Sequence, residues 1–111
     1  SWILKETLAE FLRTLREEKG FPLRKVAAAL DVDQSSLSKF ERGDRLPKED
    51  LIPKIAQFFG INEAELHLRY KSDKVLYEIM TDQNPEEILK VAEEKLQYLK
   101  SKQYTQGKLF N

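Results

Sequence analysis

The sequence predicts an all-α fold, and three observations support this. Apolar residues recur at helical spacing through most of the chain, glycines (Gly20, Gly43 and Gly60) follow three of these segments, and no segment shows the alternation of a β-strand. The composition is globular and tilted towards helix, with 41% hydrophobic residues, 34% charged residues, four Gly and four Pro. A length of 111 residues allows one small domain with one appendage.

The first two helices are predicted over residues 3–19 and about 23–30. The first carries an apolar stripe at helical spacing, formed by Leu4, Leu8, Phe11, Leu12 and Leu15. Gly20 ends this helix as a left-handed residue would. Pro22 suits the start of the second helix, whose inner positions are Val26, Ala27 and Leu30.

Three further helices complete the predicted domain. Asp33 is expected to cap a helix over about 34–42. A helix over roughly 50–59 follows, in which Pro53 must lie in the first turn. Asn62 and Glu65 form a capping-box pattern at the start of the next helix. We expect that helix to break near Ser72 if it continues, and the core to end near Leu66.

A last helix is predicted over 85–102. Asn84-Pro85-Glu86-Glu87 supplies a cap, a first-turn proline and two acids at the positive end of the helix dipole. A narrow stripe follows, made of Ile88, Val91, Ala92, Lys95, Leu96 and Leu99. The predicted organisation is therefore a domain over 3–70, a helical extension over 71–102 and a flexible tail over 103–111.

The helices over 23–30 and 34–42 have the spacing of a helix-turn-helix, because three residues join them. Ala27 must be small, since the second helix crosses close above it. Asp31 lies where the turn favours a left-handed residue, a conformation that Asp tolerates better than most residues do. The side chains expected to face outward from the second helix are Gln34, Ser35, Ser36, Ser38 and Lys39.

The run from Leu12 to Leu66 resembles the five-helix DNA-binding domain of phage-repressor-type, xenobiotic-response-element (Cro/C1-like) transcriptional regulators. The matching pieces are Leu15-Arg16-Glu17-Glu18-Lys19-Gly20, Val26-Ala27, Val32-Asp33-Gln34-Ser35-Ser36-Leu37-Ser38, Glu41-Arg42-Gly43, Pro47, Ile55-Ala56 and Phe59-Gly60-Ile61. The stretch over 37–43 is the most specific of them. About half the chain is covered, in order and without gaps.

The chain departs from the family pattern at two places. Pro22 and Leu23 stand where members commonly have Ser or Thr followed by a Gln that often binds a backbone phosphate. Leu23 cannot make that contact, so it must fall to Arg24, Lys25 or backbone N–H groups. Asp31 replaces the usual turn glycine, which adds slight strain to the turn.

The resemblance implies that the helix over 34–42 enters the major groove of duplex DNA. Base contacts are expected from the exposed face, which carries Gln34, Ser35, Ser36 and Ser38. Gln34 or a neighbour can pair with an adenine edge, and Lys39 can reach guanine or phosphate. Flanking contacts to phosphates are expected from Arg42, Arg45 and Lys48. An ordinary solvated face remains the alternative for these residues, and equally for Arg24 and Lys25.

The composition argues against catalysis and metal binding. The chain has no Cys and one His, His67, so thiolate zinc sites and multi-histidine sites are excluded. Glu86-Glu87 and Glu93-Glu94 could be drawn as catalytic carboxylate pairs, but they belong to a helix start and a solvated face. We expect no enzyme activity and no cofactor. No apolar run is long enough for a membrane span and no signal-peptide pattern is present, so a cytoplasmic protein is expected.

The charge balance gives weak guidance. Nineteen Lys and Arg offset nineteen Asp and Glu, although six basic and four acidic residues lie between Arg24 and Lys48. Glu41 is acidic, although contact with DNA phosphates favours positive charge in this segment. We therefore expect it to pair with Arg16 and tie the first helix to the third. Members of the resembled family often pair residues at these positions.

The sequence thus predicts a sequence-specific, dimeric DNA-binding transcriptional regulator, acting as a repressor on a near-palindromic operator. Dimerisation is assigned to the stripe of Ile88, Val91, Ala92, Leu96 and Leu99, with possible help from Val75, Leu76, Ile79 and Trp2. One variant is an antitoxin or restriction-modification controller whose last helix binds a protein partner. Another is a protein-interaction adaptor of the same fold that reads no DNA, which the neutral net charge favours.

Overall fold

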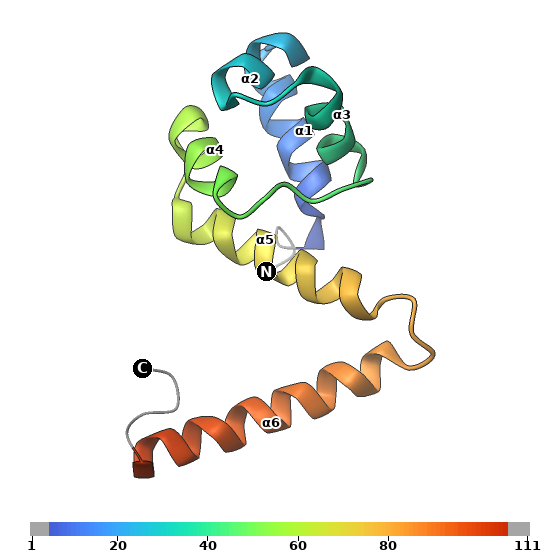
Figure 1. Cartoon of the computed structure of the whole chain (residues 1–111), viewed down its shortest axis with the longest axis vertical. Coiled ribbons are helices and arrows are strands. Elements are labelled where there is room, and N and C mark those ends of the chain that lie inside the picture. The colour runs from blue at the N-terminus through green and yellow to red at the C-terminus, as the bar shows by residue number, and fades with distance from the viewer. Residues whose placement is uncertain (1–4, 107–111) are drawn as a thin grey trace. The chain divides into compact units, whose positions relative to one another are not determined.

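The computed structural model describes residues 5–106, and all of the secondary structure in that range is helical (Figure 1). The helices are α1 (Leu8–Lys19), α2 (Leu23–Leu30), α3 (Gln34–Arg42), α4 (Leu51–Phe59), α5 (Glu63–Ile79) and α6 (Pro85–Gln106). This confirms the predicted all-α fold. The chain divides into two compact units, with the boundary after Val75.

Helix α1 begins at Leu8, so the predicted start at residue 3 is wrong. Thr7 and Glu10 form a capping box, in which the Thr7 N–H donates to Glu10 Oε1 (2.9 Å) and the Glu10 N–H donates to Thr7 Oγ1 (3.2 Å). The buried carboxylate of Asp73, on α5, accepts the Leu8 N–H at 2.8 Å. These acceptors fix the helix start. Leu4, the first residue of the predicted stripe, lies outside the described residues.

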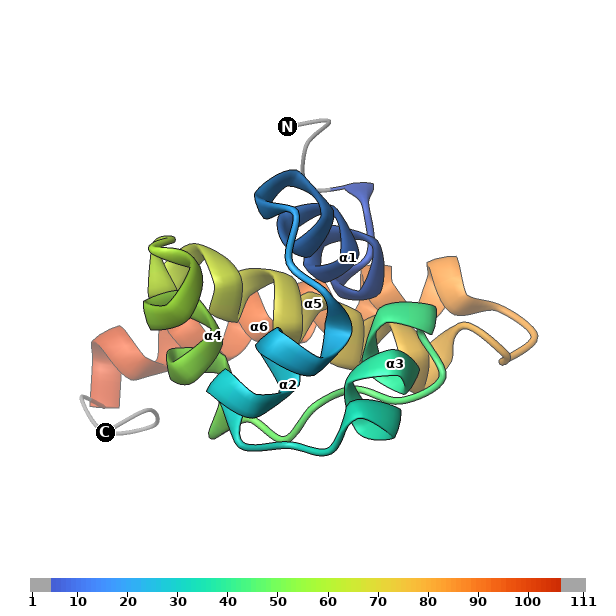
Figure 2. The ribbon, with the colours of Figure 1, turned by 90° about the horizontal axis from the view of Figure 1, so that it is seen from above.

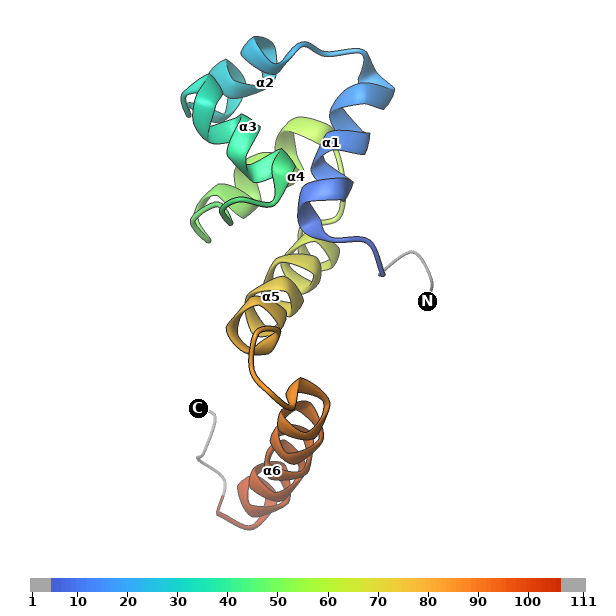
Figure 3. The same ribbon diagram turned by 90° about the vertical axis from the view of Figure 1, so that its right-hand side faces the viewer.

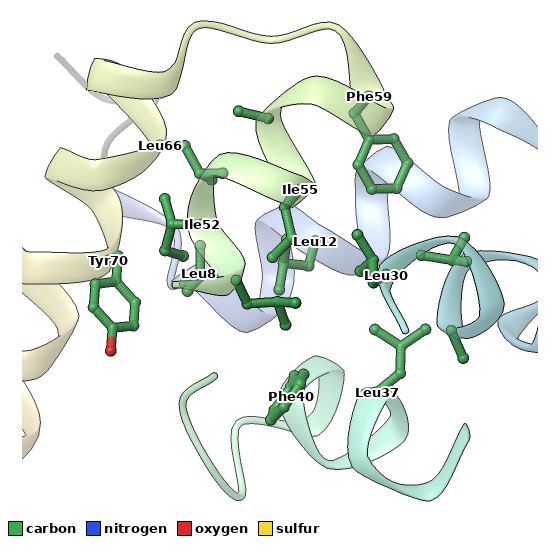
Figure 4. Packing of buried hydrophobic residues seen from close by; sticks show 14 residues of the cluster. Leu8, Leu12, Leu30, Leu37, Phe40, Ile52, Ile55, Phe59, Leu66 and Tyr70 are labelled. Atoms are coloured by element: carbon green, nitrogen blue, oxygen red, sulfur yellow. The ribbon is translucent and has the colours of Figure 1, made fainter. Parts of the chain in front are cut away.

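The core of the first unit gathers side chains from all five of its helices. Figure 4 shows Leu12 of α1, Leu30 of α2 and Ile55 of α4 pointing into one interior. Leu66 and Tyr70 on α5 are 0% and 3% exposed, so the core continues beyond its predicted end near Leu66. In the view of Figure 2, α2 and α3 form an angled pair joined by a short turn.

Helix α5 is uninterrupted from Glu63 to Ile79, and the break predicted near Ser72 is wrong (Figure 3). The Ser72 hydroxyl donates to the carbonyl of Arg69 one turn earlier (3.0 Å), which lets a serine sit inside a helix. Arg69 is buried, with its guanidinium 3.7 Å from the Phe11 ring centroid and an ion pair to Glu6 (3.2 Å). Arg69 therefore ties α5 to α1, and the bond from the Leu8 N–H to Asp73 continues this contact beyond residue 70.

Helix α6 starts at Pro85, as the cap pattern predicts, and runs to Gln106. It passes the expected end at Lys102, so residues 103–106 of the predicted tail are helical. The apolar spacing stops before the helix does, and for that reason the sequence pattern placed the end too early. The remaining tail residues, 107–111, lie outside the described part of the chain.

Candidate nucleic-acid interface

The turn between α2 and α3 depends on Asp31. This residue has φ 57° and ψ 45°, which confirms the predicted left-handed conformation. Its N–H donates to the carbonyl of Ala28 (3.2 Å), and the Val32 N–H donates to that of Ala27 (3.0 Å). These bonds close the end of α2 and turn the chain towards α3. Ala27 is buried at this point, as its small size predicts.

Asp33 caps α3 and organises the first turn of that helix. Its Oδ1 accepts the Ser36 N–H at 2.6 Å and the Ser35 hydroxyl at 2.9 Å. Hydrogen bonds from Ser36, those of its side chain first, and from Ser35 lower the pKa of the Asp33 carboxyl below its ordinary value. Because the Ser35 hydroxyl proton is already engaged, the exposed oxygen is left as an acceptor. Gln34 is exposed beside it and offers both a donor and an acceptor.

Ser36 and Ser38 hold arginines, although the sequence placed them with the base-reading residues. Arg45 Nη2 donates to Ser36 Oγ (2.8 Å), and Arg42 Nη1 donates to Ser38 Oγ (2.6 Å). Both serines are half-buried, whereas Lys39 is exposed. Sequence spacing could not predict this arrangement, because Arg45 reaches Ser36 from the loop that follows α3.

The structure brings Arg16 and Glu41 together in a mostly buried pair. Arg16 Nε donates to Glu41 Oε2 (2.8 Å) and Nη2 donates to Oε1 (2.9 Å), while Nη1 donates to the Phe21 carbonyl (2.9 Å). The two side chains are 15% and 6% exposed. The hydrogen bond to Glu41 raises the pKa of Arg16 above its ordinary value, so the guanidinium stays charged. The pair joins α1, the loop before α2, and α3.

The other predicted cations lie on either side of α3 in the chain. Arg24 and Lys25 are exposed on α2, and the Lys25 ammonium lies 4.0 Å from the Phe21 ring centroid. Lys48 is exposed in the loop before α4. Together with Arg45 it lines a hollow of about 430 Å³ beside the α2–α3 turn. Lys54 of α4 lines the same hollow, and no pattern in the sequence placed it there.

The stripe predicted on α6 is exposed. Its exposed fractions are 39% at Ile88, 36% at Val91, 44% at Leu96 and 38% at Leu99, and Ala92 is exposed as well. Leu89 (46%) and Tyr98 (61%) are further exposed apolar side chains on this helix.

The predicted helpers of this stripe differ from one another. Val75 and Leu76 are exposed, but Ile79 is buried at 8%, so it offers little surface to a partner. Trp2 lies outside the described residues.

Neither a metal-binding cluster nor a membrane-spanning helix is found in the described range 5–106. It contains no group of three His, Cys, Asp or Glu side chains able to hold a metal ion. His67 lies on the surface, 3.2 Å from Glu49. No helix of this range has both the length and the apolar character needed to cross a membrane.

The class of protein follows from this architecture and from comparison with known families. Residues 7–68 match the model of the helix-turn-helix domain, and the chain belongs to this family. The match begins at the α1 cap and ends within α5, so it includes the whole candidate interface.

Two curated proteins are similar to this chain. One is the HTH-type transcriptional regulator DdrOP3 of Deinococcus deserti, 36% identical over 59 residues that cover 53% of this chain and 46% of that protein. The other is the cryptic phage CTXphi transcriptional repressor RstR of Vibrio cholerae, 33% identical over 55 residues that cover 50% of each. The chain spans about half the length of these relatives. They confirm the resemblance to phage-repressor-type regulators.

Two solved structures share the fold, both of the clp gene regulator ClgR from Corynebacterium glutamicum. One has a TM-score of 0.50 at 30% identity, and the match covers 63% of this chain and 91% of the ClgR chain. The other has a TM-score of 0.52 at 26% identity and covers 86% and 88%.

Proposed function

We propose that this chain is a sequence-specific DNA-binding module of a transcriptional regulator, a repressor that inserts α3 into the major groove of duplex DNA. One observation carries the proposal. The uncharged start of α3 presents Gln34 and Ser35 to solvent. Ser36 and Ser38 hold Arg45 and Arg42 at the flanks of this surface. Groups that can read base edges are thus surrounded by groups that can bind phosphates. The helix-turn-helix family of the chain and the regulators similar to it support the same function.

The neutral net charge is compatible with this proposal because the relevant charge is local. Arg42 and Arg45 lie near the end of α3, and Lys48 follows in the loop. Glu41 is neutralised by Arg16 and buried, so it opposes DNA less than its sequence position suggests. Asp44 offsets Arg42 through an exposed ion pair (2.9 Å), which a phosphate can displace at little cost.

We further propose that the module acts as a homodimer through α6. A single helix-turn-helix module contacts few base pairs, and paired modules read two half-sites roughly 34 Å apart, one turn of duplex. The exposed stripe of Ile88, Val91, Ala92, Leu96 and Leu99 gives a two-fold partner an apolar surface to cover. The expected operator is therefore a near-palindrome.

A second candidate function is favoured by the width of this apolar surface. Leu89 and Tyr98 flank the stripe, so the apolar face of α6 is broader than the narrow seam of two paired helices. An antitoxin or restriction-modification controller that binds a protein partner through α6 would use this extra width. An adaptor that reads no DNA would use the same helix.

Selection from a pool of random duplexes separates these functions. We expect the full chain to enrich a near-palindromic site and to bind it about a thousandfold or more tighter than a scrambled duplex at physiological salt. Equal affinity for both duplexes would rule out sequence-specific recognition. No binding to either would favour the adaptor.

Variants of α3 should divide into two groups. Gln34→Ala or Ser35→Ala should cost about 1–3 kcal/mol on the selected site, because a base contact is lost, and less on a scrambled duplex. Arg42→Gln or Arg45→Gln should weaken binding to both duplexes and lower the salt slope by about one unit for each lost phosphate contact. Binding titrations at several salt concentrations measure both quantities. Unchanged base preference in the Gln34 and Ser35 variants would contradict their role as base readers.

A further inference from the structure

A second hollow, of about 210 Å³, lies next to the Arg16–Glu41 pair. Its lining comes from α1, α2 and α3 and consists of Arg13, Arg16, Leu23, Ser38, Glu41 and Arg42. Three of these side chains are guanidinium groups and one is a carboxylate.

The charge inside this hollow is unbalanced. Both oxygens of Glu41 accept hydrogen bonds from Arg16, and the Glu41 carboxylate is therefore already paired. Arg13 and Arg42 pair instead with Glu17 (3.2 Å) and Asp44 (2.9 Å), neither of which lines the hollow. All four of these side chains are more than half exposed. Ion pairs of this kind contribute about 0–1 kcal/mol, so either arginine can exchange its partner for another anion.

Leu23 gives a second reason to expect an anion here. It is the first residue of α2, and the N-cap residue Pro22 provides no side-chain hydrogen bond to that helix. The positive end of the α2 dipole therefore lies at the edge of the hollow. The Leu23 side chain has no polar group, so the side-chain donors must come from the arginines around it, next to the free N–H groups of the first turn of α2.

We propose that this hollow binds one phosphate of the duplex backbone, and that Arg13 is a phosphate-contacting residue of the interface. Guanidinium groups suit this role because their paired donors match the oxygens of a phosphate. Arg42 contributes from α3, while Arg16 stays fixed by Glu41 and adds positive charge behind them. The proposal rests on the DNA-binding function above. It assigns to Arg13 of α1 the phosphate contact that family members often make through a Gln at the Leu23 position. The sequence pattern alone had left that contact to Arg24, Lys25 or backbone N–H groups.

The test compares Arg13→Gln with Lys19→Gln in the full chain. Lys19 is also exposed on α1, but it does not line the hollow. Arg13→Gln should weaken binding to selected and scrambled duplexes alike by about fivefold at physiological salt, and reduce the salt slope by about one unit. Lys19→Gln should change neither by as much. Thermal unfolding should be unaffected, because Arg13 is 61% exposed.

Glu17→Gln should act in the opposite direction. It frees Arg13 from its exposed ion pair, so DNA affinity should rise. Glu18→Gln is the matched control, since Glu18 is also exposed on α1 but forms no ion pair among the described residues. The gain from Glu17→Gln over this control should disappear when Arg13 is already Gln.

A duplex series in which one phosphate at a time is a neutral methylphosphonate locates the contact. The unmodified protein should lose affinity at one position where the Arg13→Gln variant loses none. If the unmodified chain binds duplex DNA and Arg13→Gln behaves like Lys19→Gln, the phosphate site is wrong and the DNA-binding function stands. If the unmodified chain binds no duplex, the DNA-binding function itself fails.

Discussion

Glu41→Ala should destabilise the first unit by about 3 kcal/mol, a large part of the stability of a small domain. The substitution leaves the charged guanidinium of Arg16, only 15% exposed, with the Phe21 carbonyl as its remaining hydrogen-bond acceptor. An uncompensated charge in such a place costs more than the pair contributes. Urea unfolding followed by circular dichroism measures the change.

The control for this prediction is Glu17→Ala, which breaks the exposed pair with Arg13. It should change stability by less than about 1 kcal/mol. A double variant, Arg16→Met with Glu41→Leu, should regain much of the loss because no charge is then left without a partner. Equal small losses in the two single variants would mean that the buried pair contributes no more than a surface pair.

Ending the chain after Thr81 should leave a folded monomer whose affinity for the full operator falls by about 100-fold or more. The shortened chain keeps all five helices of the first unit, including Tyr70 and the carboxylate of Asp73 that caps α1. It loses α6, and with it the stripe proposed to pair two modules. Contacts within one half-site should survive.

Light scattering of the two chains measures this directly. The full chain should have twice its monomer mass of 13.0 kDa, and the shortened chain a single monomer mass. A cut after Leu68 is the control for folding, because it removes Tyr70 and Asp73 and should leave the chain unfolded. A Thr81-ended chain that remains dimeric would place the interface on the first unit, and one that unfolds would make α6 part of its core.

The sequence predicted most of the fold because the deciding features are local. Gly20 and Gly43 end helices, Asp33 caps α3, and Asp31 takes the left-handed conformation that the turn requires. Each of these follows from a few neighbouring residues. The predicted start of α1 missed a local signal, the capping box of Thr7 and Glu10, whereas the contact that continues the core along α5 is not local. Asp73 reaches the Leu8 N–H from 65 residues away, and nothing near either residue in the sequence indicates that contact.

The candidate site was predictable as a set of residues but not as an arrangement. Helical spacing places Ser36 and Ser38 near Gln34 on α3, but it cannot tell which hydroxyl accepts a hydrogen bond from an arginine of another segment. Arg13 was missed because a cation on α1 next to a Glu one turn away looks like an ordinary surface pair. Only its position beside Arg42 in a common hollow distinguishes it.

The absence of cysteine from the sequence allows one decisive measurement of where α3 lies on DNA. Ser35→Cys, labelled with a tethered DNA-cleaving reagent, should cut the selected duplex inside each half-site, from the major groove. Glu63→Cys, labelled in the same way at the start of α5, should cut weakly or not at all. Equal cleavage from both positions, or cleavage outside the half-sites from Ser35→Cys, would contradict the insertion of α3 into the major groove.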